Sequence, residues 1–116
     1  IDAFRSSGFS SGLTLIGSNV EIDNSQINVG GRFEKRGIDA NDSNGSTVTI
    51  NDTNITVDTT TASNAIGLFT SPQSQIQMGG GALSVFSLLG SAQLTQGPNI
   101  VLSGVACTLN GTTVSC

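Results

Sequence analysis

The sequence predicts an all-β fold, a single-domain parallel β-helix (β-solenoid) of about four rungs with three short strands in each rung. Three observations predict it. The strand-favouring residues Ile, Val and Thr number 10, 8 and 13 among 116 residues, while the formal net charge is only −4. An apolar pattern recurs along the chain at offsets of 28 and 24 residues. Within each copy, apolar and polar residues alternate.

The repeat is clearest between residues 19–29 and 47–57, which are related by an offset of 28 residues. A further step of 28 and then a step of 24 reach the same four apolar positions again. The four sets are Val20, Ile22, Ile27 and Val29; Val48, Ile50, Ile55 and Val57; Ile76, Met78, Leu83 and Val85; and Ile100, Leu102, Cys107 and Leu109. Each half of a unit alternates with period 2, and the halves flank a four-residue corner. We therefore expect rungs stacked about 4.8 Å apart, in a body only about 20 Å tall.

A third, looser strand is expected in each unit, and it carries fewer apolar residues than the other two. Its markers are Ile38 in the first unit, Ile66, Leu68 and Phe69 in the second, and either residues 86–89 or Leu94 in the third. Leu13 and Leu15 would mark a partial preceding unit. The expected boundaries are therefore a partial rung or cap over 1–16, repeat rungs over 17–98, and a last rung with a hairpin over 99–116.

Two segments interrupt this pattern. Residues 30–36 hold three of the four cations and are expected to form a loop that leaves the body of the solenoid. Residues 81–92 are apolar and could form a short helix, because Leu83, Phe86 and Leu89 are three residues apart. The alignment of this segment with the earlier repeats favours a strand.

The two cysteines, Cys107 and Cys116, are predicted to form a disulfide across a C-terminal hairpin. Asn110-Gly111 is a turn signal, and a four-residue loop over 110–113 would place the cysteines opposite each other. The alternatives are a two-residue turn, which offsets the pair diagonally, or two free thiols in a reducing compartment. A disulfide would imply an exported protein.

The corner residues predict a polar ladder between rungs. At the offset of 28, Asp23 lies over Asn51 and Asn24 lies over Asp52, so each carboxylate meets an amide that can donate to it. The alternative is that these four are ordinary polar turn residues whose alignment has no such role.

Charge excludes two classes of partner. The chain has four Lys+Arg and no His, so it has no electrostatic footprint for nucleic acid and no polybasic anchor for a membrane surface. The longest apolar run, near residues 83–89, is far too short to span a bilayer. We therefore expect neither nucleic-acid binding nor membrane insertion.

No catalytic, cofactor or metal site is predicted. Asp39 and Asp42 are expected to lie close together in a solvated loop and not to form a catalytic pair. If Gly45 were the glycine at position 6 of an EF-hand loop, Ala40 and Asn51 would occupy positions 1 and 12, which need strong calcium ligands. We therefore do not expect calcium binding.

The stretch from Gly17 to Gly80 resembles rungs of the right-handed parallel β-helix of bacterial surface adhesins and autotransporter passenger domains. The residues that carry the resemblance are Thr-Val-Thr-Ile-Asn-Asp-Thr-Asn-Ile-Thr-Val at 47–57 and Ser-Asn-Ala-Ile-Gly-Leu at 63–68. Passenger domains are usually longer, and a cysteine pair is not typical of them. The resemblance implies the fold and a surface location, and it transfers no functional residues.

The sequence thus predicts a non-enzymatic, secreted or surface-exposed β-solenoid with a structural or adhesive role. Its expected partners are further copies of itself, stacked head to tail on the open ends of the solenoid, or a host or cell-surface glycan. One alternative is a self-polymerising subunit of an extracellular filament. Another is a polysaccharide-binding or polysaccharide-cleaving domain, such as part of a phage spike.

Overall fold

The computed structural model describes residues 1–5, 10–61 and 63–116, and all the regular structure in these ranges is β. The described part of the chain contains no helix that could cross a membrane. The strands are β1 (Asp2–Arg5), β2 (Ser10–Thr14), β3 (Asn19–Asp23), β4 (Gln26–Gly31), β5 (Lys35–Ala40), β6 (Thr47–Asn51), β7 (Asn54–Thr59), β8 (Ala65–Thr70), β9 (Gln75–Gly79), β10 (Ala82–Ser87), β11 (Ala92–Gln96), β12 (Ile100–Ser103), β13 (Ala106–Leu109) and β14 (Thr112–Val114).

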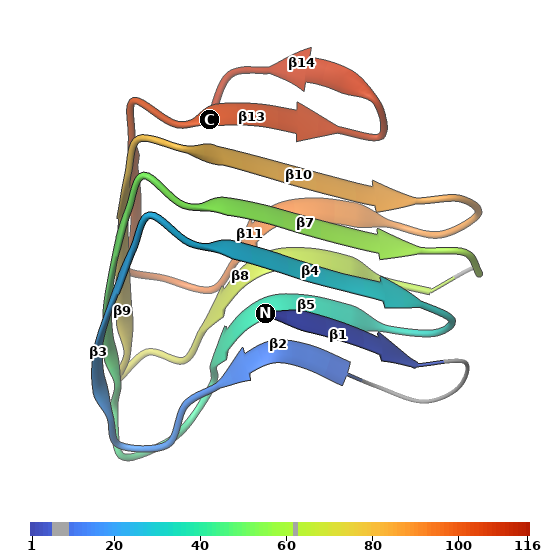
Figure 1. Cartoon of the computed structure of the whole chain (residues 1–116). Helices are drawn as coiled ribbons and strands as arrows, with labels where there is room; N and C mark the ends of the chain where they lie inside the picture. Colours follow the sequence, from blue (N-terminus) through green and yellow to red (C-terminus); the bar gives the residue numbers. More distant parts are fainter. Residues whose placement is uncertain (6–9, 62) are drawn as a thin grey trace.

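The strands wind into a parallel β-solenoid of about four turns, as predicted, and form three sheets along its axis (Figure 1). Sheet A contains β1, β4, β7, β10 and β13 in parallel, with β14 antiparallel at its edge. Sheet B has the order β11-β8-β5-β2, and sheet C has the order β12-β9-β6-β3. Each full turn of the chain therefore adds one strand to every sheet.

The register confirms the predicted offsets in sheets A and C. Val48 of β6 pairs with Val20 of β3 and with Ile76 of β9, and Ile76 pairs with Ile100 of β12. In sheet A, Ile55 pairs with Ile27 and Leu83, and Leu83 pairs with Cys107. The apolar positions thus form continuous columns parallel to the solenoid axis.

These columns form the core because successive side chains of a strand point to opposite faces. Strand β7 shows the alternation most clearly. Ile55 and Val57 are at most 1% exposed, while the alternating residues Asn54, Thr56 and Asp58 are exposed. Burying a side chain of this size contributes about 1.5–3 kcal/mol. The core is therefore built from one short apolar segment per sheet in each turn.

Sheet B settles the uncertain third strand of the repeat. Ile38 pairs with Leu13 and Leu68, as the apolar markers predicted. In the third unit the strand is β11, which contains Leu94, and not residues 86–89. Residues 82–87 instead form β10, so the prediction of a strand over a helix in this segment is confirmed.

The predicted loop over residues 30–36 is wrong in its extent. Strand β4 continues through Gly31, and β5 begins at Lys35, so only residues 32–34 connect them. The Lys35 side chain is fully buried, and its Nζ donates hydrogen bonds to the carbonyl oxygens of Arg32 and Glu34. The aliphatic stem of a lysine can pack in an apolar interior when its ammonium group reaches polar atoms. Here the carbonyl oxygens of the corner accept hydrogen bonds from that group.

Sheet B is also curved (Figure 1). Its strands β2, β5 and β8 contain Gly12, Gly37 and Gly67. A Cβ atom on Gly37 would lie 2.5 Å from the carbonyl oxygen of Gly67 and 2.8 Å from Cγ2 of Ile55. Gly12 and Gly67 are equally confined by the chain around them. Glycine at these positions therefore allows sheet B to approach the side chains of sheet A closely.

A matched pair of substitutions on β7 tests the inward register. Ile55→Asp should abolish cooperative unfolding, because an unpaired carboxylate in the core costs several kcal/mol. Thr56→Asp, one residue away on the exposed face, should retain the native circular dichroism spectrum and a cooperative thermal transition. A folded Ile55→Asp protein would show that the assigned inward face is wrong.

Candidate functional site

The corner between sheets C and A repeats the same backbone conformation on four successive rungs. Asn24, Asp52, Gly80 and Gly104 all have positive φ, at 48°, 48°, 67° and 65°. Asn, Asp and Gly tolerate this left-handed region better than other residues. The corner sequence is therefore constrained by the turn as well as by contacts between rungs.

The predicted polar ladder forms at one of its two steps. Asn51 Nδ2 donates a hydrogen bond to Asp23 Oδ1 at 2.8 Å. Asp52 lies one rung above Asn24, but its Oδ1 extends over Gly80, where it would be 2.3 Å from an added Cβ atom. Asn24 and Asp52 instead join the ladder through their backbone N–H groups, which donate to the carbonyl oxygens of Asn51 and Gly79.

Beside this corner, the outer face of sheet C carries a shallow depression of about 340 Å³. It spans three rungs, because its lining residues come from β6, β9 and β12. Residues Thr49, Gln77 and Val101 stack in one outward column and residues Asn51, Gly79 and Ser103 in the next. Gly79 supplies no side chain to its column. The depression is therefore open to solvent and lined by uncharged groups.

The opposite corner of sheet C contains a hydroxyl ladder that we did not predict. Ser46 Oγ accepts a hydrogen bond from Ser18 N at 3.1 Å, and Ser74 Oγ accepts one from Ser46 N at 2.9 Å. Ser46 and Ser74 are buried. The three serines are spaced by 28 residues, so applying the same offset to polar residues would have found them.

Asp42 joins this ladder at its centre. Its Oδ2 accepts a hydrogen bond from Gly17 N at 2.7 Å, and its Oδ1 accepts hydrogen bonds from the hydroxyl groups of Ser46 and Ser74. The pKa of the Asp42 carboxyl lies below its ordinary value of 3.8, mainly because of the hydrogen bond from Gly17 N. Partial burial acts in the opposite direction and raises this pKa. Asp42 thus acts as a structural acceptor that joins three rungs.

The expectation that Asp39 and Asp42 share a solvated loop is wrong. Asp39 belongs to β5 and is 8% exposed, and its Oδ2 accepts a hydrogen bond from Arg36 Nη1 at 3.1 Å. Arg36 and Asp39 are three residues apart in β5, so their ion pair departs from the regular alternation of a strand, in which they would point to opposite faces. Arg36 also contacts Glu34 at 2.9 Å and lies 4.0 Å from the centre of the Phe69 ring.

These contacts assign the carboxylates of this region to structural partners. Asp39 is paired with Arg36, and Asp42 is held by backbone and hydroxyl donors. In residues 1–5, 10–61 and 63–116, no group of three or more His, Cys, Asp or Glu side chains is arranged to hold a metal ion.

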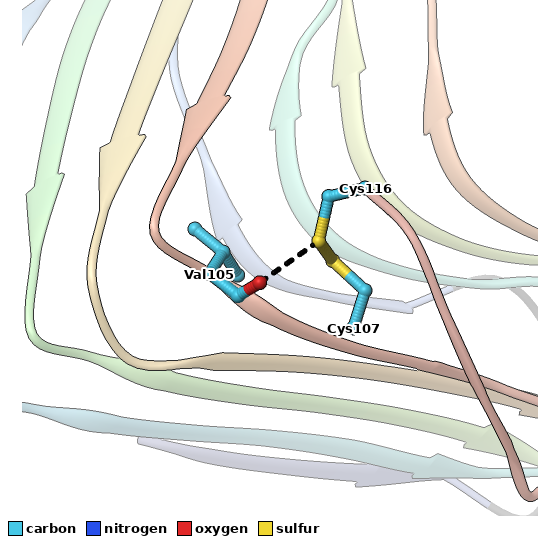
Figure 2. The surroundings of a disulfide bond; sticks show 3 residues. All are labelled: Val105, Cys107 and Cys116. Atoms are coloured by element: carbon cyan, nitrogen blue, oxygen red, sulfur yellow. Dashed lines mark hydrogen bonds between the residues drawn. A yellow bond between two sulfur atoms is a disulfide. The ribbon is translucent and has the colours of Figure 1, made fainter.

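The C-terminal hairpin carries the predicted disulfide between Cys107 and Cys116, whose Cα atoms are 5.7 Å apart (Figure 2). The predicted four-residue loop is wrong, because Leu109 pairs with Thr112 across a two-residue turn and Cys107 pairs with Val114. Cys116 therefore reaches Cys107 diagonally, from beyond the end of β14. Its Sγ lies 3.1 Å from the carbonyl oxygen of Val105, as Figure 2 shows.

This disulfide fixes the hairpin over the end of the core. Cys107 is 2% exposed and continues the inward column of Ile27, Ile55 and Leu83. The bridge thus ties the chain terminus to the last buried position of sheet A.

Reduction of the disulfide should lower the melting temperature by about 10 °C, because a loop of this length contributes about 2–3 kcal/mol. The measurement is calorimetry with and without reductant. A Cys116→Ser variant should melt like the reduced protein and should not respond to reductant. Two alkylatable thiols in the native protein, detected by mass spectrometry, would contradict the bridge.

Asp42 should make stability depend on pH. Because its pKa is lowered in the folded state, the charged form stabilises the fold above the unfolded-state pKa, and this contribution disappears as the pH falls through the folded-state pKa. The melting temperature of wild type should therefore exceed that of Asp42→Asn most at neutral pH, and the gap should narrow below about pH 4.

The matched control is Ser43→Ala, a neutral change at the next, exposed residue. Its difference in melting temperature from wild type should stay constant across the same pH range. A gap for Asp42→Asn that does not change with pH would mean that the carboxylate charge does not stabilise this corner.

Comparisons with known proteins give no match: no family model, no curated protein and no solved structure is significantly similar to this chain. Its function must therefore be inferred from its own residues and geometry.

Proposed function

We propose that this chain is a non-enzymatic, extracellular structural or adhesive element of a cell or particle surface. The observation that carries the proposal is the ladder architecture itself. Backbone hydrogen bonds connect every rung to the next in three sheets, and a disulfide pins the last hairpin. Such a stack is stiff because each rung is held by its neighbours through many parallel contacts.

The outer faces support a contact role. On sheet A, the outward column of Asn28, Thr56, Ser84 and Thr108 presents short, uncharged hydrogen-bonding groups. Side chains of this kind leave the faces hydrated and available for weak, repeated contacts. The disulfide supports an oxidising location, and the resemblance to adhesin rungs points in the same direction.

The surroundings of the carboxylates weigh against catalysis. Asp2 accepts a hydrogen bond from Asn28, Asp23 accepts one from Asn51, and Asp39 is paired with Arg36. A glycosidase needs two carboxyl groups at a defined separation across the bond that it cleaves. Carboxylates that are already bound to amide, guanidinium and hydroxyl donors are poorly suited to that task.

The hairpin also weighs against a head-to-tail filament. Strand β14 runs antiparallel on β13 and occupies the edge where β1 of a following copy would continue sheet A. In the described residues, β11 and β12 end sheets B and C without a comparable cover. A copy placed beyond β14 would leave a gap of about 4.8 Å, one strand spacing, at those two sheets. This geometry favours a monomer over a polymer.

Light scattering after size exclusion, with electron microscopy of the same sample, tests the assembly state. We expect a monodisperse monomer. Long, uniform filaments would instead support the appendage subunit, and they would require β14 to be displaced. Incubation with a panel of polysaccharides, followed by chromatography of the products, tests catalysis, and turnover would overturn the non-enzymatic proposal.

A further inference from the structure

The depression on sheet C has a feature that the fold does not require, namely the glycine at its centre. Gly79 lies outside the left-handed region that several neighbouring glycines occupy. A Cβ atom added to Gly79 would approach no atom closer than 4.0 Å, the nearest being Asn51 Oδ1 and the carbonyl oxygen of Ser103. Neither backbone strain nor crowding therefore explains why this outward position of a strand is glycine.

The next two glycines are different. Gly80 has a φ of 67°, and its added Cβ would be 2.3 Å from Asp52 Oδ1. Gly81 has a φ of 71°, and its added Cβ would be 2.1 Å from the carbonyl oxygen of Thr53. These two are needed for the corner, whereas Gly79 leaves open a space that a side chain could fill without cost to the fold.

The chemistry around this space matches a hydroxyl-rich, uncharged ligand. Thr49, Gln77 and Ser103 present uncharged donors and acceptors, and Gln77 and Ser103 are exposed. Asn51 Nδ2 donates to Asp23, while within the described residues Asn51 Oδ1 accepts no hydrogen bond and is available to a ligand hydroxyl. Amide and hydroxyl groups can both donate to and accept from sugar hydroxyls.

The charge and the shape of the depression further restrict the class of ligand that it can bind. The four Lys and Arg residues all lie within the first 36 residues. No Lys or Arg side chain that the structure describes lines the depression. An anionic ligand would therefore gain no charge-assisted hydrogen bond there. Val101 is 57% exposed at the rim and offers an apolar surface to the C–H face of a sugar ring. The depression is open and crosses three rungs, which suits a chain molecule lying along the surface.

From these observations we infer that the depression at Gly79 is a binding site for a neutral oligosaccharide. The inference rests on the proposed function and gives the adhesive role a ligand class and a location. The lining contains no aromatic ring, so each contact is weak and the affinity for one short oligosaccharide is modest. Useful adhesion would then depend on many copies displayed on one surface.

The test is a titration of isotope-labelled protein, followed by NMR, with neutral hexasaccharides of glucose, N-acetylglucosamine, mannose and xylose. At least one should produce saturable shifts in the side-chain amide signals of Asn51 and Gln77 and in the backbone signal of Gly79. Gly79→Leu fills the depression and should weaken binding at least tenfold while the melting temperature stays unchanged. Ser84→Leu, an outward change on sheet A, should bind like wild type.

Gln77→Ala is a second variant in case Gly79→Leu perturbs the fold. It removes an exposed lining group and should weaken binding severalfold. The absence of saturable shifts with every hexasaccharide would overturn the inference, and so would equal binding by folded Gly79→Leu. Either result would leave the proposal of a monomeric, non-catalytic surface element unaffected. Cleavage of a hexasaccharide in these samples would overturn the proposed function but not the location of the site.

Discussion

Each inner rung of this solenoid is held by backbone hydrogen bonds to the rung above and the rung below, so the register between rungs determines the rest of the structure. A slip of one residue would turn every inward side chain to the surface. The columns Val20–Val48–Ile76 and Ile27–Ile55–Leu83 oppose such a slip, because the positions that alternate with them, such as Thr49 and Thr56, are polar and would have to enter the core. The core and the register therefore stabilise each other.

The polar groups at the corners of the rungs follow from the same constraint. Identical positions of successive rungs lie within hydrogen-bonding distance, so a serine at one corner meets a serine at the next, as in the column Ser18–Ser46–Ser74. Asp42 adds a charged acceptor to this column, and the Asn51–Asp23 bond closes the other corner of the same sheet. The carboxylates of Asp23 and Asp42 thus stabilise the corners between strands.

The outward positions do not belong to the buried columns that fix the register. On sheet A they form a flat, hydrated surface, and on sheet C the absence of a side chain at Gly79 opens a depression between neighbouring rungs. The C-terminal hairpin differs from the other corners because β14 ends the parallel stacking of sheet A. In the function that we propose, the lateral faces make the contacts and the interior supplies stiffness.

The sequence by itself determined the fold class, the registers of sheets A and C and the cysteine pair, because period 2 and an offset of 28 are visible as side-chain types. It also aligned Asp23 with Asn51. Only the tertiary structure decided the burial of Lys35, the two-residue turn and the ion pair between Arg36 and Asp39. Those features depend on how closely distant backbone segments approach each other, and residue type along one strand does not encode that distance.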